Sequence, residues 1–265
     1  MPEKSSRTAG SELTPIIVTS PAIRCGTTLV QRLLSSSPDT LIYGEPCAAD
    51  LEFGLQMLAH KLVIFRQNAA DHERLHSATV GGTVNAWISD LMPSQENYIN
   101  GLIRSAVAGL EACRNDAAQN GRSLWGIKYP GWSPWTVSQI RELMPLARWV
   151  VVCRDLEGTL RSAKTWKGIS SAYEVEEFCK TWAANYAFYR SLANNPQVLL
   201  LNYAAIVSDP DALVTALQDF TGAAAIDRNV LNFKVNSLGG EYRAPIELTD
   251  ADREIVASAL ASIDS

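Results

Sequence analysis

Several side chains that could bind an anion or accept a proton lie at or soon after the ends of short apolar runs. In chain order they are Arg24, Cys25, Gly26, Thr27, Thr28, Glu45, Lys128, Arg154, Ser162 and Tyr203. One carboxylate among several cations suits a group transfer in which a base takes a proton from a hydroxyl and cations stabilise the departing anion. The elements that must position these side chains are therefore the strands whose ends they follow.

The first of these segments reads as strand, loop and helix. Residues 16–18 form an apolar run typical of a strand buried in a parallel sheet. Gly26 permits a close backbone approach, and Thr27 and Thr28 open a helix with one apolar face over residues 29–34. The helix N-terminus and the two hydroxyls predict an anion site, with phosphate as the expected ligand.

This loop differs from the Walker A loop of nucleotide kinases. Pro21 stands where Walker A has its first glycine, and Gly26 is followed by Thr27 instead of lysine. The cation precedes the glycine, at Arg24, and no later segment looks like a strand that ends in a magnesium-binding Asp. We therefore expect phosphate binding without a metal.

Two segments resemble the nucleotide sites of the sulfotransferases that use 3′-phosphoadenosine 5′-phosphosulfate (PAPS). Arg24 to Thr28, Arg-Cys-Gly-Thr-Thr after a strand, resembles their 5′-phosphosulfate loop, where Arg/Lys-Ser-Gly-Thr-Thr is usual. The apolar run 148–153, followed by Arg154-Asp155 and by Ser162 eight positions after the arginine, resembles their 3′-phosphate site. Cys25 stands where Ser is common, and two more residues than usual separate Pro21 from Arg24.

The resemblance extends over roughly residues 15–222. Asn202-Tyr203, an Asp-Pro at 209–210 and a helix that ends at Phe220-Thr221-Gly222 follow in the family's order, with Ala204 in place of its usual Glu. Within the family, the Gly-Glu at residues 44–45 is most similar to the tyrosylprotein and bacterial carbohydrate sulfotransferases.

The resemblance implies transfer of a sulfuryl group from PAPS to an acceptor hydroxyl, carried on a small molecule or a polypeptide, without a metal. Glu45 would be the base, and Arg24 and Lys128 would steady the sulfuryl group and the leaving phosphate. We also expect Pro46 to bias Glu45 to an extended backbone and keep it out of a helix. The donor would be bound by Arg24, Cys25, Gly26, Thr27, Thr28, Arg154, Ser162 and Tyr203. Tyr203 and Trp182 are candidates for packing near the adenine or the acceptor, with packing in the core as the alternative.

The strands expected at 15–20, 40–43, 124–128, 148–153 and 197–201 alternate with helices. This order predicts an α/β three-layer sandwich with a central parallel sheet, P-loop NTPase-like, whose right-handed crossovers bring the strand ends to one side.

Around this sheet we expect a disordered segment at 1–13 and a single domain over 14–265. A helical insertion at about 48–120 would cap the site and select the acceptor, and the loop 232–243 would close over the nucleotide. A surface helix is expected from Thr249 to Ile263.

Three alternative functions stay open at this point. His72-Glu73-Arg74-Leu75-His76 is a formal match to the HExxH motif, so a zinc hydrolase that uses His72, Glu73 and His76 is one of them. A P-loop kinase would need the missing Walker lysine and a magnesium ligand. A nucleotide-binding protein without catalysis is the third.

Composition excludes some classes of partner. A net charge of −5 argues against sequence-independent binding of nucleic acid. We expect no membrane partner, since no stretch of about 18 apolar residues occurs. Five cysteines without a CxxC pair favour reduced thiols and a cytoplasmic location. The acceptor and the oligomeric state stay undetermined.

Overall fold

A five-stranded parallel sheet forms the centre of the computed structural model, which describes residues 8–83, 85, 87–233 and 246–263. The strands are β1 (Ile16–Thr19), β2 (Thr40–Tyr43), β3 (Leu124–Lys128), β4 (Arg148–Cys153) and β5 (Val198–Asn202). Their order across the sheet is β2-β3-β1-β4-β5, and every neighbouring pair is parallel. The predicted α/β fold with a central parallel sheet is therefore confirmed.

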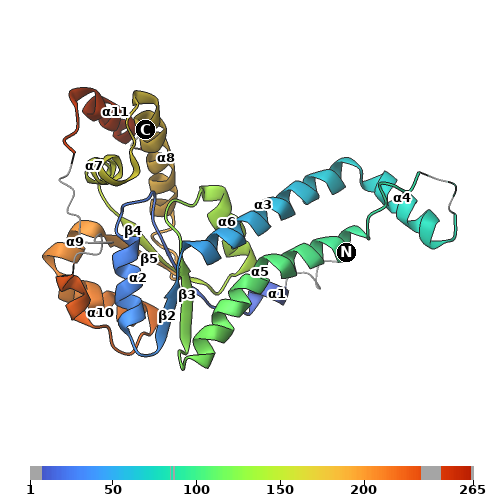
Figure 1. Ribbon diagram of the computed structural model, residues 1–265, viewed down its shortest axis with the longest axis horizontal. Coiled ribbons are helices and arrows are strands. Elements are labelled where there is room, and N and C mark those ends of the chain that lie inside the picture. Colours follow the sequence, from blue (N-terminus) through green and yellow to red (C-terminus); the bar gives the residue numbers. More distant parts are fainter. Residues whose placement is uncertain (1–7, 84, 86, 234–245, 264–265) are drawn as a thin grey trace.

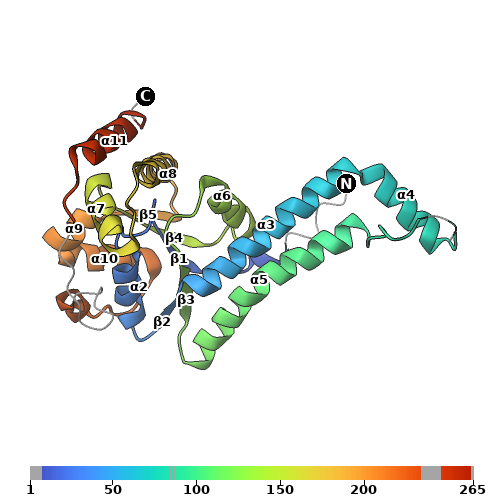
Figure 2. The same ribbon diagram turned by 45° about the horizontal axis from the view of Figure 1, so that its top comes forward.

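Helices cover both faces of this sheet (Figures 1 and 2). One face packs on α2 (Thr27–Ser36) and α10 (Pro210–Thr221), and the other on the first turns of α3 (Glu45–Gln67), on α5 (Gln95–Gln119), α6 (Pro134–Leu143) and α8 (Ala172–Ser191). Alternate strand residues supply the two faces: Ile16 and Val18 belong to the first core, and Ile17 belongs to the second. Two apolar faces explain why β1 reads as an uninterrupted apolar run.

The elements that follow β4 and β5 complete the body. Helix α7 (Leu156–Lys167) follows β4, and α9 (Tyr203–Ser208) follows β5. The 3-10 helix η1 (Arg228–Asn232) packs against α2, and α11 (Asp250–Ala261), close to the predicted surface helix, packs against α8 and α7.

The inserted segment forms a long helical arm, which we define as residues 45–119. Helices α3 and α5 run side by side out of the body and are joined at the far end by α4 (Ala69–Val80) (Figures 1 and 2). The prediction of a cap is wrong for this arm, because it extends away from the strand ends instead of folding over them. Helices α3 and α5 pack closely: a Cβ added at Gly54 would lie 2.7 Å from that of Ala106.

The N-terminal expectation also needs correction. Residues 8–11 form the short helix α1 (Thr8–Ser11) against α5, and Leu13 is buried in the core. The folded part of the chain therefore begins before residue 14, because Leu13 supplies apolar surface that the sheet and α5 need covered. Most of the loop predicted to close over the nucleotide, residues 234–243, lies outside the described residues.

Candidate active site

The loop between β1 and α2 has an unusual backbone. Arg24, with φ 72°, is the one non-glycine residue of positive φ in the described part of the chain, and Gly26 has φ 103°. Two such residues in one short loop turn the chain tightly, a geometry that gathers backbone N–H groups around an anion. Helix α2 begins at the next residue, Thr27, so its N-terminus faces the same loop.

Buried side chains fix the loop from below. Asn185 of α8 donates to the carbonyl oxygen of Pro21 at 2.8 Å, and the Ser20 hydroxyl donates to that of Ala22 at 2.7 Å. The Cys25 thiol lies 3.8 Å from the hydroxyl of Thr159, and burial raises its pKa. Cys25 is thus a neutral packing residue, and only its backbone is available to a ligand.

Three predicted phosphate ligands from two distant segments meet beside this loop, at a place we call the phosphate end. The Nε of Arg24 donates to the Ser162 hydroxyl at 3.2 Å, and Nη1 of Arg154 donates to the carbonyl oxygen of Arg24 at 3.3 Å. Helix α7 therefore does fold back across the strand end. The Asp155 side chain caps its start by accepting from the N–H of Gly158.

The phosphate end holds two positive charges close together. Partial burial and then the charge of Arg154 lower the pKa of Arg24. Among the described residues neither guanidinium forms an ion pair with a carboxylate. Arg154 instead lies over the ring of Tyr203 at 4.7 Å, and Arg24 over that of Trp166 at 5.5 Å. Such a pair is suited to an anionic ligand of more than one charge.

Tyr203 also explains why residue 26 is glycine. A Cβ at this position would lie 2.6 Å from two ring carbons of Tyr203. The ring therefore packs directly on the loop backbone, with Arg154 on it, and both predicted residues contribute to one surface.

Glu45 and Lys128 form what we call the transfer end of the same sheet edge. Lys128 Nζ lies 2.6 Å from Oε1 of Glu45 and 3.5 Å from the hydroxyl of Thr28. The lysine side chain is almost fully buried, whereas that of Glu45 is 53% exposed. The pair therefore presents a carboxylate toward solvent and an ammonium group behind it.

The expected backbone of Glu45 is wrong in one respect. Glu45 is the first residue of α3, and Pro46 lies in the helix's first turn instead of keeping Glu45 extended. Proline suits this position because its missing N–H would have no partner there. The helix start also favours the negative charge of Glu45.

Sequence reasoning missed three residues that build the site, and of the two alternatives for Trp182 the structure bears out core packing. Trp166 follows Ser162 by four positions, so helical spacing could have placed it beside Arg24. Thr159 and Asn185 lie far from the loop in the sequence and contact it only in the folded chain, so no sequence pattern could have identified them. Trp182 stacks on Tyr186 at 4.6 Å and is almost fully buried, which makes it a core residue.

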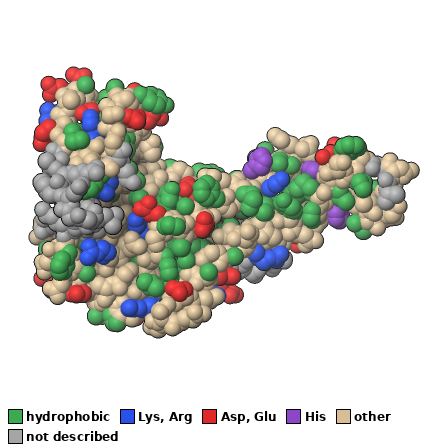
Figure 3. Space-filling model, viewed as in Figure 1, with side chains coloured by type: hydrophobic (Ala, Val, Ile, Leu, Met, Phe, Trp, Pro, Cys, Tyr) green, Lys and Arg blue, Asp and Glu red, His purple; other side chains and the backbone are tan. Residues whose placement is uncertain are grey.

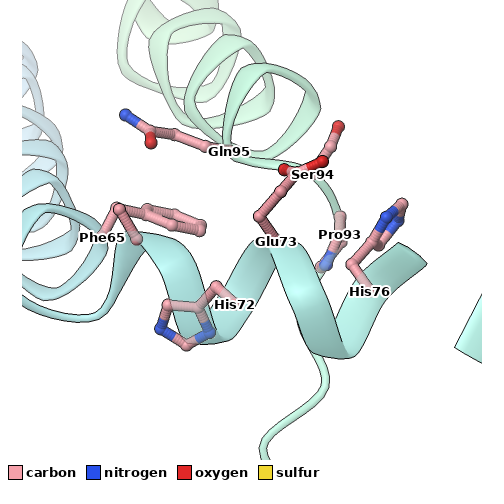
Figure 4. A pocket seen from close by; sticks show the side chains of 8 residues that line it. Phe65, His72, Glu73, His76, Pro93, Ser94 and Gln95 are labelled. Atoms are coloured by element: carbon pink, nitrogen blue, oxygen red, sulfur yellow. The ribbon is translucent and has the colours of Figure 1, made fainter. Parts of the chain in front are cut away.

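The HExxH segment lies on α4, far out on the arm (Figure 1). His72, Glu73 and His76 line a cavity of only about 30 Å³, and Figure 4 shows the two imidazole rings pointing in different directions. In the part of the chain that the structure describes, no group of three or more His, Cys, Asp or Glu residues could hold a metal ion. The HExxH segment therefore contributes no residue to the sheet edge where Arg24, Glu45 and Lys128 lie.

Comparison with known proteins identifies the family. A sulfotransferase family model matches residues 15–227, which is most of the chain. The chain belongs to the sulfotransferase family. No curated protein sequence matches it. Family membership supports sulfuryl transfer and does not favour a kinase or a zinc hydrolase.

Solved sulfotransferase structures share the fold at low sequence identity. The sulfotransferase domain of the Synechococcus PCC 7002 olefin synthase is 17% identical, with 94% of this chain and 95% of that chain covered and a TM-score of 0.52. An Alicyclobacillus acidocaldarius sulfotransferase is 14% identical over 95% of each chain, with a TM-score of 0.51. The sulfotransferase domain from the curacin biosynthetic pathway is 15% identical, with 95% and 99% covered and a TM-score of 0.50. Among the described residues, no helix is long and apolar enough to span a membrane.

Proposed function

We propose that this sulfotransferase uses PAPS as donor and that Glu45 is the base which deprotonates the acceptor hydroxyl. The observation that carries the proposal is the division of one sheet edge into two ends. Arg24, Arg154 and Ser162 meet at the phosphate end, and the Glu45–Lys128 pair lies at the transfer end. The loop and the first turn of α2 connect the two.

The phosphate end fits the phosphates of such a donor. Among the described residues neither guanidinium group has a carboxylate partner, and charge-assisted hydrogen bonds to a phosphate would balance the two positive charges. Arg154 and Ser162 would hold the 3′-phosphate. The 5′-phosphosulfate would lie on Arg24, the backbone of Cys25 and Gly26, and the hydroxyls of Thr27 and Thr28. When bound, the donor supplies an activated sulfuryl group on a phosphate leaving group.

The transfer end fits the proton transfer. Oε1 of Glu45 accepts from Lys128, while no hydrogen bond among the described residues reaches Oε2. That second oxygen is available to an acceptor hydroxyl from solvent, and the helix start holds the carboxylate in place. Lys128 donates to Oε1 of Glu45 and, with Arg24, stabilises the negative charge that develops on the leaving phosphate. No metal is needed for these steps.

The acceptor is a hydroxyl of a small molecule or a polypeptide. The half-exposed position of Glu45 supports an acceptor that approaches from open solvent. A cytoplasmic location is part of the proposal and rests on five cysteines without a CxxC pair.

Transfer of radiolabelled sulfate from PAPS to a panel of phenols, sugars and peptides tests the proposal. We expect label in at least one hydroxyl acceptor, and release of adenosine 3′,5′-bisphosphate in equal amount. The parallel reaction with ATP should transfer no phosphate. The bisphosphate could also bind tightly while no label is transferred, either to the panel or to the compounds of a whole-cell extract. That result would instead support a nucleotide-binding protein without catalysis.

A further inference from the structure

The outer part of the arm lacks a core of its own. We define the distal arm as residues 57–104. Phe65 is its one buried side chain among the described residues, and α4 has no buried residue at all. A helix of 12 residues is not stable in water by itself, so α4 needs apolar cover.

Large apolar side chains are exposed along the distal arm, and Figure 3 shows such side chains spread over its surface. They are Met57, Val63, Val80, Trp87, Ile88 and Leu91. At the far end a hollow of about 730 Å³ opens between the end of α3, α4 and the segment before α5. Its lining combines apolar Ile64, Leu75, Trp87 and Leu91 with two basic and two acidic side chains. Exposed apolar surface beside a hollow of this size is typical of a protein interface.

We propose that the distal arm pairs with the distal arm of a second copy of this chain. The charges favour this occupant over others. The distal arm contains four Lys or Arg residues and four Asp or Glu residues, so its net charge is zero and the chain's net −5 lies elsewhere. Nucleic acid or an anionic membrane would require a basic excess. An identical partner brings both signs of charge and a matching apolar face.

The dimensions of the distal arm suit a small dimer interface. Residues 57–67 of α3 make up about 16 Å of helix at 1.5 Å per residue, and two adjacent helices are about 20 Å wide, so one face of this pair covers about 330 Å². The 12 residues of α4 add about 180 Å². Two copies would together bury about 1,000 Å², the lower limit for a specific interface. In a two-fold pairing of two such hairpins, exposed apolar side chains of the two copies can cover one another.

Pairing leaves the site of each copy complete. Glu45 is the first residue of α3, the helix whose outer half lies in the proposed interface. Each copy keeps a complete set of its own site residues, because the distal arm supplies none of them. The proposal therefore concerns assembly and stands or falls independently of the proposed donor and base.

Light scattering of the full chain during gel filtration, over a range of concentrations, tests the pairing. We expect a molar mass of twice the chain's 28.9 kDa. Val63→Asp and Trp87→Asp, each an exposed position of the distal arm, should shift the mass to that of one chain. Leu146→Asp and Tyr173→Asp are matched controls on the body, with exposures of 50% and 71% against 49% and 75%. Both controls should remain dimeric.

Hydrogen exchange separates pairing from misfolding. In the wild type the amides of α4 should exchange more slowly as concentration rises, and in Trp87→Asp they should exchange fast at every concentration while the sheet stays protected. A wild type that has the mass of one chain at every concentration overturns the proposal. A dimer that survives both distal substitutions, or dissociates equally with a body control, overturns it as well.

Discussion

The phosphate end and the transfer end share one sheet edge but differ in how their charges are balanced. At the phosphate end Arg24 and Arg154 lie close together with aromatic rings beneath them and no carboxylate partner in the described residues. At the transfer end Lys128 is buried against Glu45 at 2.6 Å. One end thus needs a ligand to complete its electrostatics, and the other is already complete.

This difference separates binding from chemistry. Two like charges held near each other disfavour the free protein and favour a multivalent anion. The ion pair of Glu45 with Lys128 forms within the chain itself, so the carboxylate is held in place without a nucleotide. Substitutions at the phosphate end should therefore change affinity, whereas those at the transfer end should change turnover.

Glu45→Gln should give the largest effect on turnover. The amide keeps the size of the side chain and removes its basicity, and a positioned base contributes roughly 10² to 10⁴ in rate. We expect kcat for sulfuryl transfer to fall by about that factor, while calorimetry gives nearly unchanged binding of adenosine 3′,5′-bisphosphate. Asp50→Asn, an exposed carboxylate on the same helix, is the control and should retain kcat.

Two results would contradict the role of Glu45. Wild-type turnover in Glu45→Gln on a true acceptor would mean that the base lies elsewhere. Loss of bisphosphate binding without a separate loss of kcat would make Glu45 a structural support of the loop, and the two ends would not be independent.

Arg154→Ala should give the next largest effect, on binding. A charge-assisted contact to the extra phosphate is worth about 1.5–3 kcal/mol. Wild type should therefore bind the 3′,5′-bisphosphate about tenfold to a hundredfold more tightly than AMP, and Arg154→Ala should lose most of this preference. Arg253→Ala, an exposed arginine on α11, should keep it. Equal calorimetric affinities of the wild type for AMP and the bisphosphate would refute the assignment of the phosphate end.

The strands and the residues at their ends could be predicted because both depend on local patterns. Five apolar runs fixed the strands to within a residue or two, and parallel topology then required their ends to meet. That argument brought Arg24, Arg154 and Lys128 to one edge. The same rule placed Glu45 on this edge, but it did not predict the ion pair of Glu45 with Lys128.

Other features depend on contacts that no local pattern encodes. The pairing of α3 with α5 in the arm includes the close approach of Gly54 to Ala106, which lie 52 positions apart. The left-handed conformation of Arg24 comes from a loop held by Asn185 and Thr159. Pro46 is compatible with an extended chain before it and with a helix start, and only tertiary packing selects the helix.

Gly26→Ala should disturb the junction between the two ends. A φ of 103° is strained for alanine, and the added methyl group would overlap the Tyr203 ring. We expect a loss of about 1–3 kcal/mol in the free energy of unfolding measured with urea, together with weaker bisphosphate binding. Gly109→Ala is the control, because a Cβ there meets nothing within 4 Å and alanine favours the helix. Unchanged stability in Gly26→Ala would show that the loop relaxes freely.

Asp252→Asn should have a smaller, pH-dependent effect on the support of α7. Burial alone would raise the pKa of Asp252, but Lys164 of α7 and the Thr249 groups outweigh it and leave this pKa below its usual value. A lowered carboxyl pKa stabilises the fold above the usual value of about 3.9, and this contribution is lost as the pH falls through the folded value. The wild type should exceed the variant by about 1–2 kcal/mol at pH 7, and the difference should shrink below about pH 4.

Asp250→Asn is the matched control for the Asp252 pair, because Asp250 is exposed, lies two residues before Asp252 and contacts Arg253. It should change stability by less than about 0.5 kcal/mol at pH 7. A difference between wild type and Asp252→Asn that is constant from pH 3 to pH 7 would mean that packing, and not the ion pair with Lys164, holds α11 on α7.

Removal of metal should have the smallest effect. Glu45 and Lys128 supply the base and the cation at the transfer end, and His72 and His76 lie far out on α4, where their rings point in different directions (Figure 4). Transfer should persist in EDTA, and the double variant His72→Ala with His76→Ala should keep kcat within a few-fold of wild type. Elemental analysis of the purified chain should find well below one zinc per molecule. Activity that disappears with the chelator and returns with zinc, in wild type but not in the double variant, would move the chemistry from the sheet edge to the arm and reverse the roles given to the two regions.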